Sequence, residues 1–352
     1  MSSVICGVVY ASHVPGSLVN RLSKLFYHFH LLETEQQLVD FLSYDATWLS
    51  GKDLAVELAD TVAHIESQAF VSTLVGTDQH IWHILLLSPQ PERKYYYRCW
   101  NADEVGSPCC VVDCISSIVE GALDSLLGIH SNSMETMGED WQMIPFVSPL
   151  ERLLRHQIPY CVWLPKYQRL SCFPRLQNVI IFPGSFHPLH RGHIELAKAA
   201  GQLSQRCVVF ELSIENADKG KWSKSQVMER LSQFTSSLGY LCVLTVEPLF
   251  YKKAQLFPGA FFVVGVDTAQ RMVDLKYYNH NYQEMITCLQ PLMESGTKIL
   301  VAGRIQDPCS NTGRYLTLQD VSIPWTLQSL FYPIPQELFR CDISSTMLRN
   351  KA

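Results

Sequence analysis

The sequence predicts an α/β protein whose C-terminal half forms a doubly wound parallel sheet and whose N-terminal half forms a mixed α/β domain. Strand and helix patterns alternate regularly from about residue 178 onward, which is the order of βαβ units. Before residue 178, helical and strand patterns both occur but do not alternate regularly. With 352 residues, 47% of them hydrophobic, the chain can bury more than one core.

The N-terminal region, residues 1–130, contains both helix-like and strand-like segments. Apolar residues at helical spacing predict helices, and runs rich in β-branched and aromatic residues between turn residues predict strands. In chain order we expect a strand at 5–10, helices at 17–30, 34–42 and 53–65, strands at 68–76, 80–87 and 94–100, and a helix at 113–127. Residues 130–140 are polar and irregular, 148–156 have a short helical pattern and 160–173 are mixed, so residues 131–177 are predicted to be a linker region.

Residues 178–352 are predicted to form the second domain. Strands are expected at 179–182, 207–213, 242–246, 261–266 and 298–302, and helices at 192–201, 223–238, 254–256, 282–295 and after residue 345. In such a sheet, ligands bind at the carboxyl ends of the strands.

Composition excludes several classes of protein. The net charge of −5 and a pI near 6.2 argue against nucleic-acid binding, which would favour a basic surface. The twelve cysteines follow neither a zinc-ligand nor a Cys-x-x-Cys spacing, which favours free thiols in a reducing compartment. No stretch has the length and apolarity of a membrane span or signal segment, so we expect a soluble cytoplasmic protein without a membrane partner.

The turn after the strand at 179–182 carries residues suited to phosphate chemistry. It reads Gly-Ser-Phe-His-Pro-Leu-His-Arg-Gly-His over residues 184–193. Gly184 allows close approach of the backbone to a ligand. His190 and His193 flank the start of a helix, whose N–H groups and dipole favour anions. Because His187 precedes these two at three-residue spacing, a zinc site is a competing interpretation.

A second segment, Ile-Ser-Ser-Thr-Met-Leu-Arg at residues 343–349, is typical of a helix start. Arg349 follows Ser345 by four positions and Thr346 by three, so all three share one side of the helix. Together with Ser344 they supply hydroxyls, amides and a guanidinium, which suit a polyphosphate. Ordinary helix capping is the alternative.

These two segments resemble the Gly-Ser-Phe-x-Pro-x-His-x-Gly-His and Ile-Ser-Ser-Thr-x-x-Arg motifs of the nucleotidylyltransferase superfamily, most closely the nicotinamide- or nicotinate-mononucleotide adenylyltransferases. The resemblance implies a Rossmann-like fold and assigns nucleotide contacts to Gly184, Ser185 and Phe186. His187 occupies a position where relatives often carry Asn or Asp, which leaves the acceptor open.

Other positions match the family more weakly. The segment Gly265-Val266-Asp267-Thr268 resembles the family's Gly-x-Asp segment, which implies nucleotide contacts for Gly265 and Asp267. Arg304 follows a predicted strand and is a further nucleotide contact. Lys219, Trp222 and His187 are the candidates for binding the acceptor. Each has an ordinary alternative. Asp267 could cap a turn, Lys219 and Arg304 could be solvated surface residues, and Trp222 could be structural.

The resemblance implies transfer of the adenylyl group of ATP, with Mg²⁺, to a small phosphorylated acceptor, giving NAD or its acid precursor. His190 and His193 would be the catalytic residues. A CTP-using or phosphopantetheine-type transferase and a non-catalytic nucleotide-binding regulator remain alternatives. The N-terminal region faintly resembles a CinA-type amidase domain, and a degenerate, structural or dimerising domain is favoured over an active amidase. Homo-oligomerisation is left open.

Overall fold

The computed structural model describes residues 5–11, 16–26, 28–32, 35–42, 49, 51–65, 70–76, 81–87, 94–101, 115, 118–119, 141–145, 147–172, 176–216, 220–306, 314–341, 343 and 345–351. The chain divides into two units, Met1–Ser148 and Pro149–Ala352, and each is described by itself. Among the described residues, no helix has the length and apolar character needed to cross a membrane.

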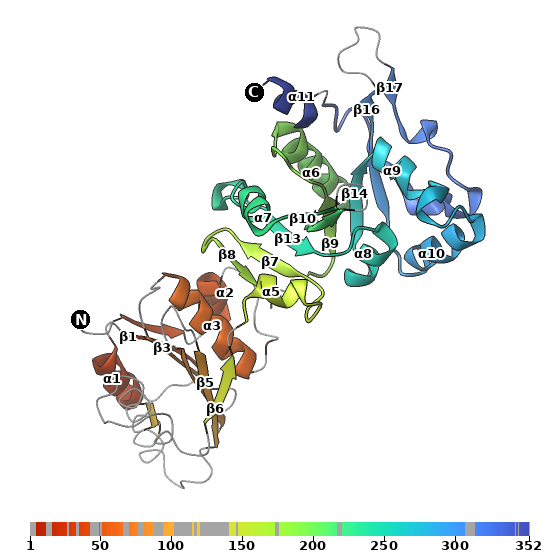
Figure 1. The fold of residues 1–352 in the computed structure, drawn as a ribbon. Coiled ribbons are helices and arrows are strands. Elements are labelled where there is room, and N and C mark those ends of the chain that lie inside the picture. Colours follow the sequence, from red (N-terminus) through yellow and green to blue (C-terminus); the bar gives the residue numbers. More distant parts are fainter. Residues whose placement is uncertain are drawn as a thin grey trace. The chain divides into compact units, whose positions relative to one another are not determined.

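The N-terminal unit is built on a six-stranded sheet in the order β2-β1-β3-β4-β5-β6 (Figure 1). Its first three strands are parallel and the others antiparallel. The strands are β1 (Ile5–Tyr10), β2 (His28–Leu32), β3 (Phe70–Gly76), β4 (Ile81–Leu87), β5 (Lys94–Asn101) and β6 (Gln142–Pro145), and the helices are α1 (Gly16–Leu25), α2 (Glu35–Leu42) and α3 (Gly51–Ile65). Separate apolar clusters form with α1 and with α2 and α3, so both faces of the sheet are covered.

One sequence-based expectation in this region differs from the structure, and a second lies mostly outside the described residues. The helix expected at 17–30 ends at Leu25, and β2 begins at His28. Residues 28–32 pair with β1 and bury Leu32, a tertiary interaction that the helical spacing does not reveal. Most of the helix expected at 113–127 lies outside the described residues.

The stretch 131–177, expected to be a linker, contributes to both sheets. Strand β6 completes the N-terminal sheet, whereas α5 (Pro149–Leu154), β7 (Cys161–Leu164) and β8 (Arg169–Ser171) belong to the C-terminal unit. The division after Ser148 therefore falls before, not at, residue 178. These strands are only three or four residues long, too short for a clear period-two pattern.

The C-terminal unit confirms the expected α/β fold. Its eight-stranded sheet has the order β18-β15-β14-β9-β10-β13-β7-β8. The first six strands are parallel, and the β7–β8 hairpin adds antiparallel to β13. The parallel strands are β9 (Val179–Pro183), β10 (Cys207–Ser213), β13 (Leu241–Thr245), β14 (Phe261–Gly265), β15 (Ile299–Ala302) and β18 (Phe331–Pro333).

Helices connect these strands, as a doubly wound sheet requires (Figure 1). They are α6 (Arg191–Ser204), α7 (Lys224–Leu231), α8 (Phe250–Leu256), α9 (Val266–Met272) and α10 (Tyr282–Glu294), and α11 (Ser345–Lys351) follows the last strand. Two small antiparallel pairs, β11 (Glu215–Asn216) with β12 (Gly220–Lys221) and β16 (Arg304–Ile305) with β17 (Tyr315–Leu316), lie outside the main sheet. Strand order reverses at β9, between β10 and β14, so the ligand-binding crevice is expected at its carboxyl end.

Candidate active site

The buried ring of Phe186 anchors the turn between β9 and α6 to the core. Phe186 has a positive φ of 41° and is 2% exposed, and its ring packs edge-on against Phe182 and Phe210. A Cβ atom on Gly184 would lie 2.5 Å from that ring. Gly184 is therefore required for packing. The Phe186 side chain belongs to the core, where it is unavailable to a nucleotide, so only its backbone could make the contact expected from the sequence.

Gln233 fixes the conformation of this turn from outside it. Its side-chain amide donates to the carbonyl of Phe186 at 2.9 Å and accepts from the N–H of Leu189 at 2.7 Å. One side chain thus satisfies two backbone groups of the turn. The sequence analysis missed Gln233, because it lies 47 residues after Phe186 and belongs to neither motif.

His190 and His193 form a stacked pair at the start of α6. Their ring centroids lie 3.7 Å apart, and the ring planes differ by 27°. The backbone N–H of His190 donates to Nδ1 of His193 at 3.2 Å, so the neutral His193 ring carries its proton on Nε2. Nδ1 of His190 is buried, with no hydrogen-bond partner among the described residues. In each ring, Nε2 is therefore the nitrogen that can reach a ligand.

Burial keeps both imidazoles neutral in the ligand-free protein. Burial, followed by the neighbouring His190, lowers the pKa of His193 to about 3, and burial also lowers the pKa of His190. At neutral pH both rings therefore carry no positive charge, and His193 presents an Nε2–H donor whose tautomer is fixed by the bond from the His190 N–H. Binding of an anion would favour the protonated form and raise both pKa values.

The C-terminal motif contacts the histidine turn directly. The Ser345 hydroxyl donates to the carbonyl of Pro188 at 2.9 Å, and the Arg349 guanidinium donates to the carbonyl of His187. The two segments that the sequence singled out, more than 150 residues apart, are therefore adjacent. Ser344 lies outside the described residues, and Thr346 is described only as part of helix α11.

A cleft of about 240 Å³ opens at the carboxyl ends of β9, β14 and β15. Of the predicted site residues, it is lined by His190, His193, Gly265, Arg304 and Ser345. Further lining comes from Phe182, Pro183, Gly192, Leu196, Thr268, Ala302, Gly303, Ile305, Phe339, Cys341 and Ile343. The guanidinium of Arg304 is ion-paired with Asp267, which is not a lining residue. The structure thus brings five predicted residues from four separate segments to one cleft.

Two of the three residues expected to bind the acceptor, His187 and Trp222, are described, and neither lines this cleft. His187 is half-exposed, and its Nδ1 is 3.9 Å from Glu229 of α7. Trp222 is half-buried beneath the Arg230 guanidinium, 4.2 Å from the ring centroid. The pKa of Arg230 is lowered mainly by burial and partly by the charge of Arg349. The prediction for Lys219 lies outside the described residues.

The zinc interpretation receives no support from the described geometry. Among the described side chains, no three His, Cys, Asp or Glu residues are grouped so that they could hold a metal ion. Nδ1 of His193 is occupied by the His190 N–H, and Nδ1 of His190 is buried. Ser185 is partly exposed and does not line the cleft.

Comparison with known families agrees with this geometry. Residues 181–351 match the family model described as cytidylyltransferase-like. The match runs from within β9 into α11 and includes both motif-bearing segments. Fold and match together support nucleotidyltransferase activity for the C-terminal unit. No curated protein matches the chain.

Proposed function

We propose that the C-terminal unit transfers the adenylyl group of ATP to the phosphate of nicotinamide or nicotinate mononucleotide, giving a dinucleotide and pyrophosphate. The observation that carries this proposal is the convergence of His190, His193 and Ser345 on one cleft at the helix α6 N-terminus. These groups, together with the free N–H groups at the start of the helix, can donate hydrogen bonds to phosphate oxygens.

The proposed reaction is an in-line displacement. A phosphate oxygen of the acceptor forms a bond to the α-phosphorus of ATP, and the bond from that phosphorus to the bridging oxygen of the β-phosphate breaks. His193 contributes an Nε2–H donor whose orientation is set by the bond from the His190 N–H. Such a preoriented donor stabilises charge that develops on the transferring phosphate. No covalent intermediate on the protein is needed.

Ser345 and Arg349 are proposed to hold the β- and γ-phosphates. Both groups contact backbone carbonyls of the histidine turn, so α11 and the turn form one surface. Guanidinium binds phosphate oxygens through paired N–H donors. The departing pyrophosphate would remain on this surface until release. Gly265 and Arg304 line the same cleft and would contact the nucleoside part.

Mg²⁺ is expected to enter with the nucleotide. Of the described residues that line the cleft, none is a carboxylate. The ion would therefore be held by phosphate oxygens and water, as is common for Mg²⁺ at nucleotide sites. Bound there, it would neutralise charge on the phosphates.

A second candidate is cytidylyl transfer from CTP, favoured by the description of the matching family. The two candidates use the same phosphate contacts and differ only in the base and the acceptor. The test is a matrix of assays with ATP or CTP and Mg²⁺ against nicotinamide mononucleotide, nicotinate mononucleotide and phosphopantetheine, with dinucleotide products identified by mass. Product from ATP and a pyridine mononucleotide supports the proposal. Product from CTP alone would replace it with the second candidate.

For the N-terminal unit we propose a structural or dimerising role in a cytoplasmic protein. Its described residues form a covered sheet with two apolar clusters, which supplies stability by itself. Light scattering of the full chain tests dimerisation, and an assay for release of ammonia from nicotinamide mononucleotide tests the amidase alternative.

A further inference from the structure

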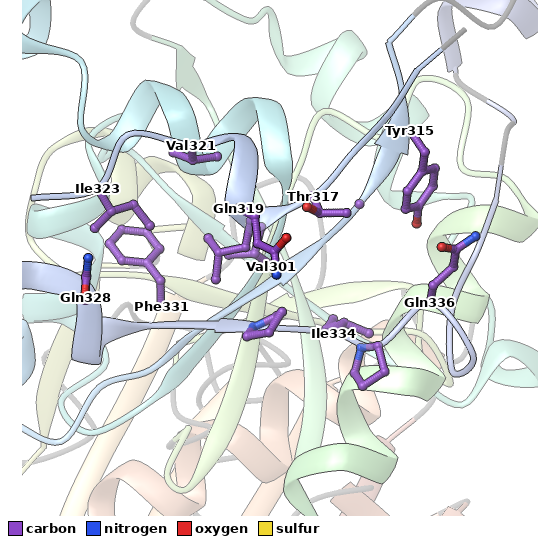
Figure 2. Close-up of a pocket in the computed structure, with 14 residues that line it drawn as sticks. Val301, Tyr315, Thr317, Gln319, Val321, Ile323, Gln328, Phe331, Ile334 and Gln336 are labelled. Carbon is purple, nitrogen blue, oxygen red and sulfur yellow. The ribbon is translucent and has the colours of Figure 1, made fainter. Parts of the chain in front are cut away.

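A second and larger cavity adjoins the nucleotide cleft through Gly303, which lines both. It measures about 580 Å³, within the roughly 300–1,000 Å³ of small-molecule sites. It is open to solvent on one side and is lined by residues of β15, β17 and β18 and of the segments that follow β17 and β18. Figure 2 shows Ile323 and Phe331 at one end and Tyr315 and Gln336 at the other. The proposed reaction leaves this cavity unused.

The lining of this cavity combines apolar walls with neutral polar groups. The apolar residues are Val301, Leu318, Val321, Ile323, Phe331, Pro333, Ile334 and Pro335, and the neutral polar ones are Tyr315, Thr317, Gln319, Gln328 and Gln336. Within the described lining there is no Asp, Glu, Lys, Arg or His. A phosphate or carboxylate placed against this lining would find no counter-charge there to offset the water it gives up. The cavity therefore suits an uncharged ligand.

The three glutamines indicate what kind of uncharged ligand fits. Each carboxamide both donates and accepts hydrogen bonds. It can therefore accept from the N6 amino group of adenine while it donates to N7. Gln319 lies near the middle of the cavity and Gln336 at its Tyr315 end (Figure 2). The aliphatic and aromatic walls offer flat contact to the faces of a planar ring. A purine has both flat faces that can pack on these walls and a hydrogen-bonding edge that can pair with a glutamine.

The wall between cavity and cleft is closely packed. A Cβ atom on Gly303 would lie 2.6 Å from the Tyr315 ring and 2.7 Å from the carbonyl oxygen of Leu316. Gly303 leads directly into β16, which pairs with β17 and carries Arg304. Tyr315 lines the cavity, and Arg304 lines the cleft. A ligand on one side of this wall therefore contacts residues that lie next to the other site.

We propose that this cavity is a second ligand site, which binds an uncharged purine base or nucleoside beside the nucleotide cleft. It is separate from the site of the proposed reaction and does not depend on that reaction being correct. The chemistry of its lining excludes the triphosphate and selects a neutral heterocycle.

The test measures adenosine binding to the full chain by equilibrium dialysis, with saturating α,β-methylene-ATP and Mg²⁺ to occupy the cleft. We expect one adenosine per chain, and at least tenfold weaker binding of adenosine 5′-monophosphate. Gln319→Leu and Gln336→Leu should each weaken adenosine binding about tenfold. Both positions are exposed, so these variants are expected to fold, and a circular dichroism spectrum like that of the wild type reports that they have.

Gln202→Leu on α6 is the matched control, because it makes the same chemical change on an exposed surface outside the cavity. It should leave adenosine binding unchanged. The proposal is overturned if adenosine does not bind at millimolar concentration, if the monophosphate binds equally well, or if the two cavity variants bind adenosine like the wild type. The last result would place adenosine elsewhere, including in the cleft.

Discussion

The hydroxyl of Ser345 donates a 2.9 Å hydrogen bond to the carbonyl oxygen of Pro188, which lies 157 residues earlier in the chain. One turn of α11 further on, Arg349 donates to the carbonyl of His187. These contacts join the turn between β9 and α6 to the C-terminal helix α11. They explain why the two motifs are informative as a pair, since each holds part of the other in place.

Replacing Arg349 by Ala should weaken ATP binding about ten- to a hundredfold. Hydrogen bonds to a charged group contribute about 1.5–3 kcal/mol each, and this variant also loses its contact with the turn. Isothermal titration with ATP and Mg²⁺ measures the change. Arg155→Ala is the control, because Arg155 is an exposed residue outside both motifs and is ion-paired with Glu151. Equal affinity of both variants for ATP would contradict the placement of the triphosphate.

Gln233→Leu should lower both stability and turnover. The variant leaves the Phe186 carbonyl and the Leu189 N–H without their side-chain partner, which should cost about 2 kcal/mol of unfolding free energy. Because the turn would relax, kcat should fall more than substrate affinity does. Urea denaturation and steady-state kinetics measure the two effects. Unchanged kcat in a destabilised variant would show that Gln233 contributes to stability alone.

The buried ion pair between Lys253 and Glu211 should behave as a unit. Nζ of Lys253 lies 2.6 Å from Oε2 of Glu211, and both side chains are buried. Lys253→Met leaves the Glu211 carboxylate buried and unpaired, which should cost about 3–5 kcal/mol. Adding Glu211→Gln should restore much of that loss. Lys252→Met, at a half-exposed neighbouring lysine, is the control in the same denaturation series. Destabilisation that simply adds in the double variant would contradict this.

The stability of the ligand-free protein should depend on pH through His193. In the unfolded chain this residue takes up a proton as the pH falls below about 6.5, whereas in the folded protein its pKa is lowered to about 3. Between these values the unfolded state binds more protons, so stability falls as the pH falls. His193→Gln removes this titration and should flatten the dependence of unfolding free energy on pH between 7 and 5. Parallel curves for variant and wild type would argue against a neutral, buried His193.

The parallel sheet could be predicted from the sequence alone, because β9, β14 and β15 are apolar runs bounded by turn residues. The sequence did not predict β18 or the β7–β8 hairpin, since strands of three or four residues are defined by their pairing partners rather than by periodicity. The same limit applies to Gln233. Its role depends on a contact between distant segments, and no local spacing encodes it.

The central claim is most directly tested by pyrophosphate release from ATP, Mg²⁺ and nicotinamide mononucleotide, measured for the wild type and for His193→Ala. The wild type should release one pyrophosphate per dinucleotide formed. The variant should be about a hundred- to a thousandfold slower, as expected when one preoriented donor to the transition state is lost. Its circular dichroism spectrum should match that of the wild type. Wild-type protein that releases no pyrophosphate, or a folded variant that turns over at the wild-type rate, would contradict the assignment.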